Sequence, residues 1–401
     1  MWKALPMPIP ESSRRRGLAI MLGCFALYAV ASVIDTLKGV TLSSLLAETR
    51  YSYSLGGLIV SAFYLGYMAA NLAIGAVSER FGKKAPAMLS AVFLVAGSIG
   101  LAIADRPAAY LASSFLNGMG GGASLLACNV ILIDLRSRDT GRWLNLLYAV
   151  FGLCSMLTPL YARLVMAGNG SWRNAFQYAA LAAGFTLAYL AWARYPAGES
   201  APGSVPPSRL NLRELARLAL SGRMFWYYLI VFAYIVTEVG LGTWLVEYFQ
   251  KVRGHSHDDS QAWLSIFYAG IMGGRLLGSL VVDRVGHLRC LALGGGACLL
   301  SLLLGQFGPD WCVYALPASG LFLSVILPTA AAHMSSRLAS GRDAALGAMF
   351  AFIGVGGMTG PLLIGMAGSH WSLDGGMAVT TLSCLVMLAA IRRAGKDAAR
   401  G

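Results

Sequence analysis

The sequence predicts an all-α membrane protein with twelve transmembrane helices in two pseudo-symmetric six-helix bundles. Three observations indicate this fold: an apolar composition, a row of long apolar segments and a passage that occurs twice. Of the 401 residues, 57% are hydrophobic and 12% are charged. Soluble domains carry roughly 25% charged residues, so most of this surface is not built to face water.

Twelve apolar segments have the length that a membrane span needs. Crossing a bilayer takes about 20 mostly apolar residues. The first six segments lie at 17–40, 54–77, 85–104, 108–133, 143–167 and 173–195. After a break, six more lie at 225–249, 261–282, 288–308, 311–334, 344–367 and 371–391. The equal sets predict two bundles of six helices.

The break between the two sets reads as an interdomain linker. Residues 196–223 contain Pro196, Pro202, Pro206 and Pro207, followed by several arginines. Proline clusters in a polar stretch favour a loop, with a short amphipathic helix expected at 209–220. The predicted domains are therefore an N-terminal bundle at 1–195, a cytoplasmic linker at 196–223 and a C-terminal bundle at 224–401.

The basic residues predict how the chain is oriented in the membrane. The net charge is +13, but Lys and Arg are scattered among short loops, which does not suit a nucleic-acid footprint. With the N-terminus inside, 23 of the 31 basic residues fall in inside segments, and Lys38 is counted with those outside. Cytoplasmic loops carry such an excess. We expect a multi-pass protein of the cytoplasmic (inner) membrane with both termini in the cytoplasm.

The duplicated passage places an acid in a matching apolar segment of each half. Asp35 and Glu238 are about 200 residues apart, as are Tyr64 and Tyr268. A duplicated membrane bundle with an ionisable group at a matching position in each half is typical of secondary transporters.

These acids are the candidate proton-coupling groups. An acid in a membrane span has to be protonated, paired or in contact with a wet cavity. We place Glu238 first and Asp35 second, and a structural hydrogen bond between helices is the alternative reading. Arg275 is predicted as the one basic residue deep in a span, with Glu238 as its candidate partner. Its possible roles are substrate anchor, counter-charge to a proton site and interhelical strut.

Amide and aromatic side chains in the spans predict a site for a sugar-like solute. Amides commonly grip sugar hydroxyls and aromatic rings stack on sugar faces, although Trp and Tyr are also enriched at membrane interfaces. The candidate substrate-binding residues are Asn129, Asn145, Tyr148, Trp244, Tyr268, Asn117 and Tyr64. No hydrolase, metalloprotease or P-loop motif occurs, and the seven cysteines form no CxxC pair. We therefore expect no enzyme activity, no cofactor and no metal.

A motif between the second and third segments identifies a family resemblance. The stretch from Gly75 to Lys84 reads GAVSERFGKK, and a degenerate copy, DRVG, begins at Asp283. This resembles the cytoplasmic signature of the major facilitator superfamily, G-x-x-x-D-R-x-G-[RK]-[RK], with Glu79 in place of the usual Asp. The resemblance implies gating roles for Gly75, Glu79, Arg80, Gly82, Lys83, Asp134, Asp283, Arg284 and Gly286. Glu79 would meet the N-terminal end of the eleventh helix, and the basic residues would pair with acids such as Asp134.

Within that superfamily, several stretches are similar to fucose-permease-type sugar porters. They are Asn129, the LNLLY run from Leu144 to Tyr148, the EVGLGTWL run from Glu238 to Leu245 and the ILPT run from Ile326. The similarity implies proton-coupled sugar uptake by alternating access. One departure is Leu125, because fucose permease has a glutamate at the matching place. Coupling would then rest on Asp35 or Glu238.

Two alternatives stay open. One is a proton-driven antiporter that exports drugs, siderophores or metabolites, although the G-P motif common in the fifth helix of such exporters is degenerate here, as GLCSMLTP from Gly152 to Pro159. The other is a non-transporting receptor or assembly factor on the same bundle. We expect the partners to be a small-molecule substrate, protons and the bilayer, with a monomeric chain and no nucleic acid.

Overall fold

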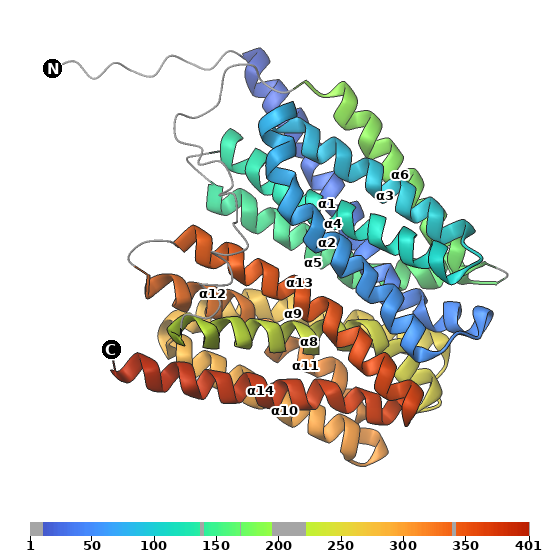
Figure 1. Cartoon of the computed structure of the whole chain (residues 1–401), viewed down its shortest axis with the longest axis vertical. Helices are drawn as coiled ribbons and strands as arrows, with labels where there is room; N and C mark the ends of the chain where they lie inside the picture. The colour runs from blue at the N-terminus through green and yellow to red at the C-terminus, as the bar shows by residue number, and fades with distance from the viewer. Residues whose placement is uncertain (1–10, 137–139, 169, 195–221, 339–341, 401) are drawn as a thin grey trace.

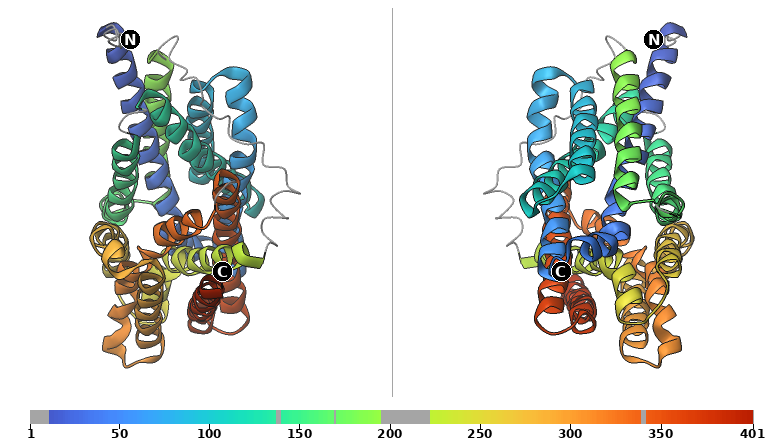
Figure 2. Two further views of the ribbon diagram at one scale, coloured as in Figure 1. Left: turned by 90° about the vertical axis from the view of Figure 1, so that its left-hand side faces the viewer. Right: turned by 90° about the vertical axis from the view of Figure 1, so that its right-hand side faces the viewer.

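The computed structural model describes residues 11–136, 140–168, 170–194, 222–338 and 342–400. Within these residues the regular structure is helical. Most of the predicted linker, including the helix expected at 209–220, lies outside the described part. Figure 1 shows the two sets of helices as separate bundles, and in both views of Figure 2 the N-terminal bundle lies above the C-terminal one.

The N-terminal bundle consists of six helices. Their bounds are α1 Glu11–Thr49, α2 Tyr53–Phe81, α3 Lys84–Ile103, α4 Pro107–Leu135, α5 Thr140–Met166 and α6 Trp172–Trp192. The predicted first segment ended at residue 40, but α1 continues to Thr49. The polar residues beyond residue 40 are accommodated within the helix, because the Thr41 and Thr49 hydroxyls donate to the carbonyls of Leu37 and Leu45 four residues earlier.

The C-terminal bundle repeats this arrangement with one broken span. Its helices are α8 Gly222–Lys251, α9 His257–Val285, α10 His287–Phe307, α13 Arg342–His370 and α14 Leu373–Arg400. The tenth span consists of η1 Asp310–Tyr314, α11 Ala315–Leu323 and α12 Ile326–Ser336. Its α-helix breaks at Ser324, because Pro328, four residues on, has no N–H to bond the Ser324 carbonyl. The fold class is confirmed, since the described residues form the twelve predicted spans.

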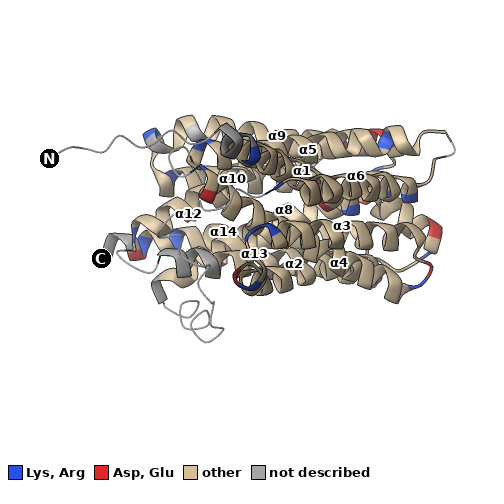
Figure 3. Ribbon diagram, turned by 90° about the horizontal axis from the view of Figure 1, so that it is seen from above, with Lys and Arg blue, Asp and Glu red and all other residues tan. Residues whose placement is uncertain are grey.

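Length and apolar composition support a membrane location. Ten of the described helices or spans are long and apolar enough to cross a bilayer, while α6 and α9 fall outside that set. α9 carries Asp258, Asp259, Arg275 and Arg284, which lower its hydropathy. Figure 3 shows charged residues gathered mostly toward the two ends of the bundles, with long uncharged stretches between. This is the charge pattern of helices whose middle lies in hydrocarbon.

Equivalent packing contacts occur at matching positions of the two halves, as expected for an internal repeat of one six-helix fold. In the N-terminal half, a Cβ on Gly118 of α4 would overlap the backbone carbonyl of Phe63 in α2. In the C-terminal half, a Cβ on Gly320 of α11 would overlap the carbonyl of Phe267 in α9. Small residues let membrane helices approach this closely. The motif glycines Gly82 and Gly286 also match, because each ends its helix with a positive φ, 83° and 88°.

The halves contact each other through α1, α2 and α5 on one side and α8, α9 and α13 on the other. The Ser54 N–H donates to Ser369 Oγ at 2.8 Å, and Ser43 Oγ donates to Gln250 Oε1 at 3.0 Å. We call this the closed end, defined by residues 43–54, 247–261 and 361–369. Hydrogen bonds between described residues of the two halves lie there or near the middle. Figure 1 shows the bundles parting toward the opposite end, which carries both termini.

Candidate substrate cavity between the halves

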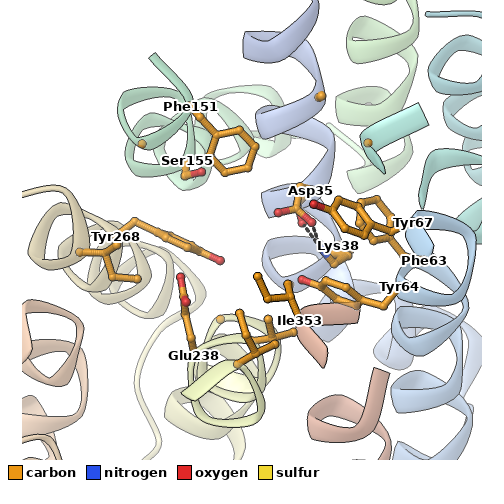
Figure 4. A pocket seen from close by; sticks show the side chains of 18 of the residues that line it. Asp35, Lys38, Phe63, Tyr64, Tyr67, Phe151, Ser155, Glu238, Tyr268 and Ile353 are labelled. Atoms are coloured by element: carbon orange, nitrogen blue, oxygen red, sulfur yellow. Dashed lines mark hydrogen bonds and ion pairs between the residues drawn. The ribbon is translucent and has the colours of Figure 1, made fainter. Parts of the chain in front are cut away.

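A cavity of about 200 Å³ lies between the two bundles. Its walls come mainly from α1, α2, α5, α8 and α9, so both halves contribute. The structure brings five of the predicted site residues together in this lining: Asp35, Tyr64, Glu238, Tyr268 and Arg275. Figure 4 shows Glu238 and Tyr268 pointing into the space opposite Asp35 and Tyr64. Groups about 200 residues apart in the chain therefore share one site.

Asp35 pairs with Lys38, which the sequence analysis counted with the outside segments. Lys38 Nζ forms an ion pair with the Asp35 carboxylate, and it also donates to the Asp35 backbone carbonyl at 2.7 Å. Its ammonium lies 4.0 Å from the ring centroid of Phe63 and 4.7 Å from that of Tyr64. Aromatic faces attract cations at such distances. Lys38 therefore belongs to the cavity, and it should not be counted among the basic residues of the outside segments.

The prediction that Arg275 is the only basic residue deep in a span is wrong, because Lys38 lines the same cavity from within α1. The missed signal was the spacing, because residues three apart on a helix share a face. A lysine one turn after an intramembrane acid is a candidate partner for that acid.

Glu238 and Arg275 form a second, looser charged group. The two side chains interact electrostatically across α8 and α9, as the sequence suggested. The buried Tyr234 hydroxyl is close to both side chains and interacts with each of them. Within the described part of the chain Arg275 forms no close ion pair, and its side-chain hydrogen-bond partner is the Tyr234 hydroxyl. Its guanidinium faces the cavity with hydrogen-bonding capacity to spare.

Aromatic rings form much of the remaining wall. Tyr28 packs against Phe151 with ring centroids 4.9 Å apart, and Tyr28 and Tyr234 both interact with Arg275. Tyr64 and Tyr268, at matching positions of the two halves, each face both acids. The lining therefore combines two acids, two bases and many ring faces. It contains no Asn, Gln or Trp side chain among the described residues.

The other candidate substrate-binding residues lie outside this lining. Trp244 is fully buried, and its indole N–H donates to the Pro361 carbonyl at 3.1 Å. Asn117 is buried where α3 meets α4, and Ser98 Oγ donates to its side-chain oxygen at 3.2 Å. Both side chains serve helix packing.

Two further candidates form a pair beside the cavity. Asn129 Nδ2 donates to the Tyr148 hydroxyl at 3.0 Å. Tyr148 also interacts electrostatically with Arg275, so this pair lies close to the site without lining it. Asn145 is exposed on α5.

The predicted gate residues lie at the end opposite the closed end. Lys83 Nζ pairs with the Asp134 carboxylate at 2.5 Å, as the family resemblance implied, and this contact ties the α2–α3 turn to α4. Gly75 is partly buried, while Glu79, Arg80 and Arg284 are exposed. The Asp283 side chain and the first side chains of α13, where Glu79 was expected to bind, lie outside the described part.

Comparison with known proteins identifies the family. The model of the Major Facilitator Superfamily matches residues 20–316 and 256–399. Together these ranges cover most of the chain, so this protein belongs to the Major Facilitator Superfamily. Members of this family are transporters and not enzymes.

Individual relatives differ in what they carry. A gentisate transporter of Corynebacterium glutamicum is 24% identical over 315 residues, 76% of this chain and 70% of that protein. The multidrug resistance protein MdtL of Escherichia coli O81 is 30% identical over 138 residues, 34% of this chain and 35% of its own length.

Solved structures confirm the fold. A D-xylose–proton symporter superposes with a TM-score of 0.75 at 16% identity, covering 93% of this chain and 96% of that one. The fucose–proton symporter of E. coli gives 0.63 at 17% identity, covering 95% and 99%.

Proposed function

We propose that this protein is a proton-coupled symporter that moves a small polar organic solute by alternating access to the cavity between its halves. One observation carries the proposal: an acid from each half, Asp35 and Glu238, faces the same cavity, each with a basic neighbour. Ionisable groups inside a membrane protein are expensive to keep and mark ion or proton pathways. The solved D-xylose and fucose symporters with this fold are named as proton-coupled.

The proposed role of Glu238 follows from charge. The conformational change that switches access to the cavity from one side of the membrane to the other is easier when the charges in the cavity are balanced. If Glu238 takes up a proton when solute binds and releases it on the other side, proton and solute move together. Asp35 is the second choice, because its carboxylate is already engaged in an ion pair with Lys38. A ligand can shift such an equilibrium only by binding the two states differently.

The orientation of the chain is proposed from its basic residues. The end with both termini carries the excess of Lys and Arg, and this excess supports a cytoplasmic location for that end. The described conformation then has its closed end outside, and the Lys83–Asp134 pair lies at the inner end. A reporter fused to the C-terminus that is active only in the cytoplasm should be active. Activity of a periplasm-specific reporter at that position would reverse the assignment.

The test of coupling starts from a substrate panel. Purified protein is screened for thermal stabilisation by sugars, amino acids, siderophores and organic acids, with D-xylose, fucose and gentisate included. The best ligand is then followed in proteoliposomes with an imposed pH gradient. Wild-type protein should accumulate it when the proton gradient points inward.

Glu238→Gln separates coupling from binding. This variant should lose gradient-driven accumulation but retain exchange of labelled for unlabelled solute, because the glutamine cannot carry a proton. Arg106→Gln, in a highly exposed loop position, is the matched control and should behave as wild type. If Glu238→Gln still accumulates solute, the proton site lies elsewhere and Asp35→Asn is the next variant.

Export by proton antiport is the second candidate, and the MdtL relative favours it. The size of the cavity argues against large drugs. Pockets for drug-sized ligands span roughly 300–1,000 Å³, whereas this cavity has about 200 Å³ in the described conformation. In the vesicle experiment, antiport would show as solute moving against the proton flux.

A further inference from the structure

We propose that the transported solute is a small organic anion with a planar ring, and that Arg275 binds its carboxylate. This inference rests on the proposed transport function and names the substrate class for the same cavity. It departs from the sugar-like solute that the sequence suggested.

The first argument is the unused hydrogen-bonding capacity of Arg275. A guanidinium presents five N–H donors in a rigid plane that matches the two oxygens of a carboxylate. Within the described residues, the Tyr234 hydroxyl is the one side-chain hydrogen-bond partner of Arg275, and its counter-charge Glu238 interacts with it only at longer range. One hydroxyl leaves most of the five donors unused. A bound carboxylate would accept the remaining donors.

The contrast with the other basic residues of the N- and C-terminal bundles supports this reading. Lys38 is engaged by the Asp35 carboxylate, the Asp35 carbonyl and two ring faces. Arg173 and Arg253 each bond carbonyls at the end of a neighbouring helix, α3 and α10 respectively. Those three cations have structural partners. Arg275 lines the cavity, where an occupant can accept its remaining donors.

The second argument is the wall around Arg275. Tyr28, Phe151 and Tyr234 lie on the cavity surface next to it, and Tyr28 and Phe151 already pack ring to ring. A planar ring attached to the carboxylate would lie against these faces, and such pairs favour offset or edge-to-face packing. The described lining lacks the amide side chains that commonly bind sugar hydroxyls. The cavity volume suits one ring and one acidic group.

Anion binding at this place also explains how a proton could be coupled to the solute. In the empty cavity, the positive charge of Arg275 balances the ionised carboxylate of Glu238. When a ligand carboxylate is bound, Arg275 balances the charge of the ligand instead. Glu238 then faces a second anion and takes one proton from solution, so that one anion and one proton occupy the cavity together. The charged or titratable groups that face Glu238 from the surrounding helices are Arg275, Tyr234, Asp35, Tyr64 and Tyr268.

The experiment uses matched pairs of ligands. Purified wild-type protein is titrated with 4-hydroxybenzoate and related ring carboxylates, with the corresponding neutral amides, and with D-xylose. We expect the acid to bind at least tenfold more tightly than its amide, a difference of about 1.4 kcal/mol. Equal binding of acid and amide, or no binding of any ring carboxylate, would overturn the proposal.

Two variants test the residue assignment. Arg275→Lys keeps the charge but loses the planar fork, and it should weaken the acid at least tenfold while leaving the folded, monodisperse protein intact. Arg106→Gln should bind as wild type. Wild-type affinity for the acid in both Arg275→Lys and Arg275→Gln would contradict the assignment.

A proton measurement separates this inference from the proposed function. In weakly buffered solution between pH 6 and 8, roughly one proton should be taken up per anion bound; Glu238→Gln should bind the anion without that uptake. If the acid binds through Arg275 but Glu238→Gln vesicles still accumulate it, the substrate class stands and the coupling assignment fails. If a pH gradient drives uptake of a neutral sugar in an Arg275→Gln variant, the transport proposal stands and the substrate class is wrong.

Discussion

Asp35 and Lys38 form the most tightly engaged charged pair in the cavity, and they belong to the same helix. The side chains are only 28% and 10% exposed, respectively. Leaving one charge without its partner in such a place costs more than removing both, because the survivor keeps its desolvation penalty. The pair therefore constrains which single substitutions the protein tolerates.

This constraint gives a prediction at the residue scale. Asp35→Asn should lower the stability of the purified protein by roughly 1–3 kcal/mol, since Lys38 loses its counter-charge. The double variant Asp35→Asn/Lys38→Met should recover part of that loss. Thermal melting of the four proteins of the cycle measures the coupling. Purely additive losses would show that the two side chains do not stabilise each other.

The sequence predicted the charged residues of the site better than its neutral ones. Asp35 and Glu238 were found because an acid in an apolar segment is costly and therefore conspicuous, and the repeat gave each a counterpart. Lys38 was missed because a lysine near a segment end looks like a loop residue. Trp244 and Asn117 looked like cavity residues because their burial depends on α13 and α3, whose packing no local pattern reveals.

At the scale of helices, glycines decide how closely the halves meet at the closed end. A Cβ on Gly57 of α2 would overlap the Pro361 carbonyl of α13 and lie 3.2 Å from the Leu362 Cα. A Cβ on Gly273 of α9, by contrast, would meet nothing within 4 Å. Backbone atoms cannot move aside as flexible side chains do, so a methyl group at residue 57 should push α2 and α13 apart.

We therefore expect Gly57→Ala to favour the opposite conformation. Transport should slow by about tenfold or more, equivalent to about 1.4 kcal/mol, and a thiol-reactive probe should reach the closed end faster. Ser43→Cys reports this access, because Ser43 is only 3% exposed. Gly273→Ala is the control and should change neither quantity. Unchanged labelling at position 43 in Gly57→Ala would mean that the two helices absorb the methyl group locally.

The helices themselves were predictable to a large extent, but their ends were not. The twelve spans were predicted from the lengths of apolar segments, although α6 and α9 are less apolar than the ten described spans that qualify by length and composition. The end of α1 was placed at residue 40 because polar residues interrupt the run, although the helix continues to Thr49. The break at Ser324 was not predicted, because Pro328 was considered only as part of the ILPT run. Its missing N–H, which leaves the Ser324 carbonyl unbonded, was the signal for the break.

At the scale of the whole molecule, two similar bundles enclose a charged cavity and touch at the closed end and near the middle in the described conformation. Matching glycine–carbonyl contacts, Gly118 to Phe63 and Gly320 to Phe267, give each half its own rigid packing. The contacts between the halves are fewer and partly polar, such as Arg163 with Asp258 at 3.1 Å. Rigid halves joined by a separable interface are what rocking requires.

Locking the closed end tests this account most directly. Ser54 and Ser369 hydrogen-bond across the two halves at 2.8 Å, so Ser54→Cys/Ser369→Cys can be joined by a short, reducible thiol cross-linker. We predict that the cross-linked protein still binds solute from its other end but no longer carries it across the membrane. Reduction should restore transport. Full transport by fully cross-linked protein would show that the closed end need not open, and alternating access between these halves would be wrong.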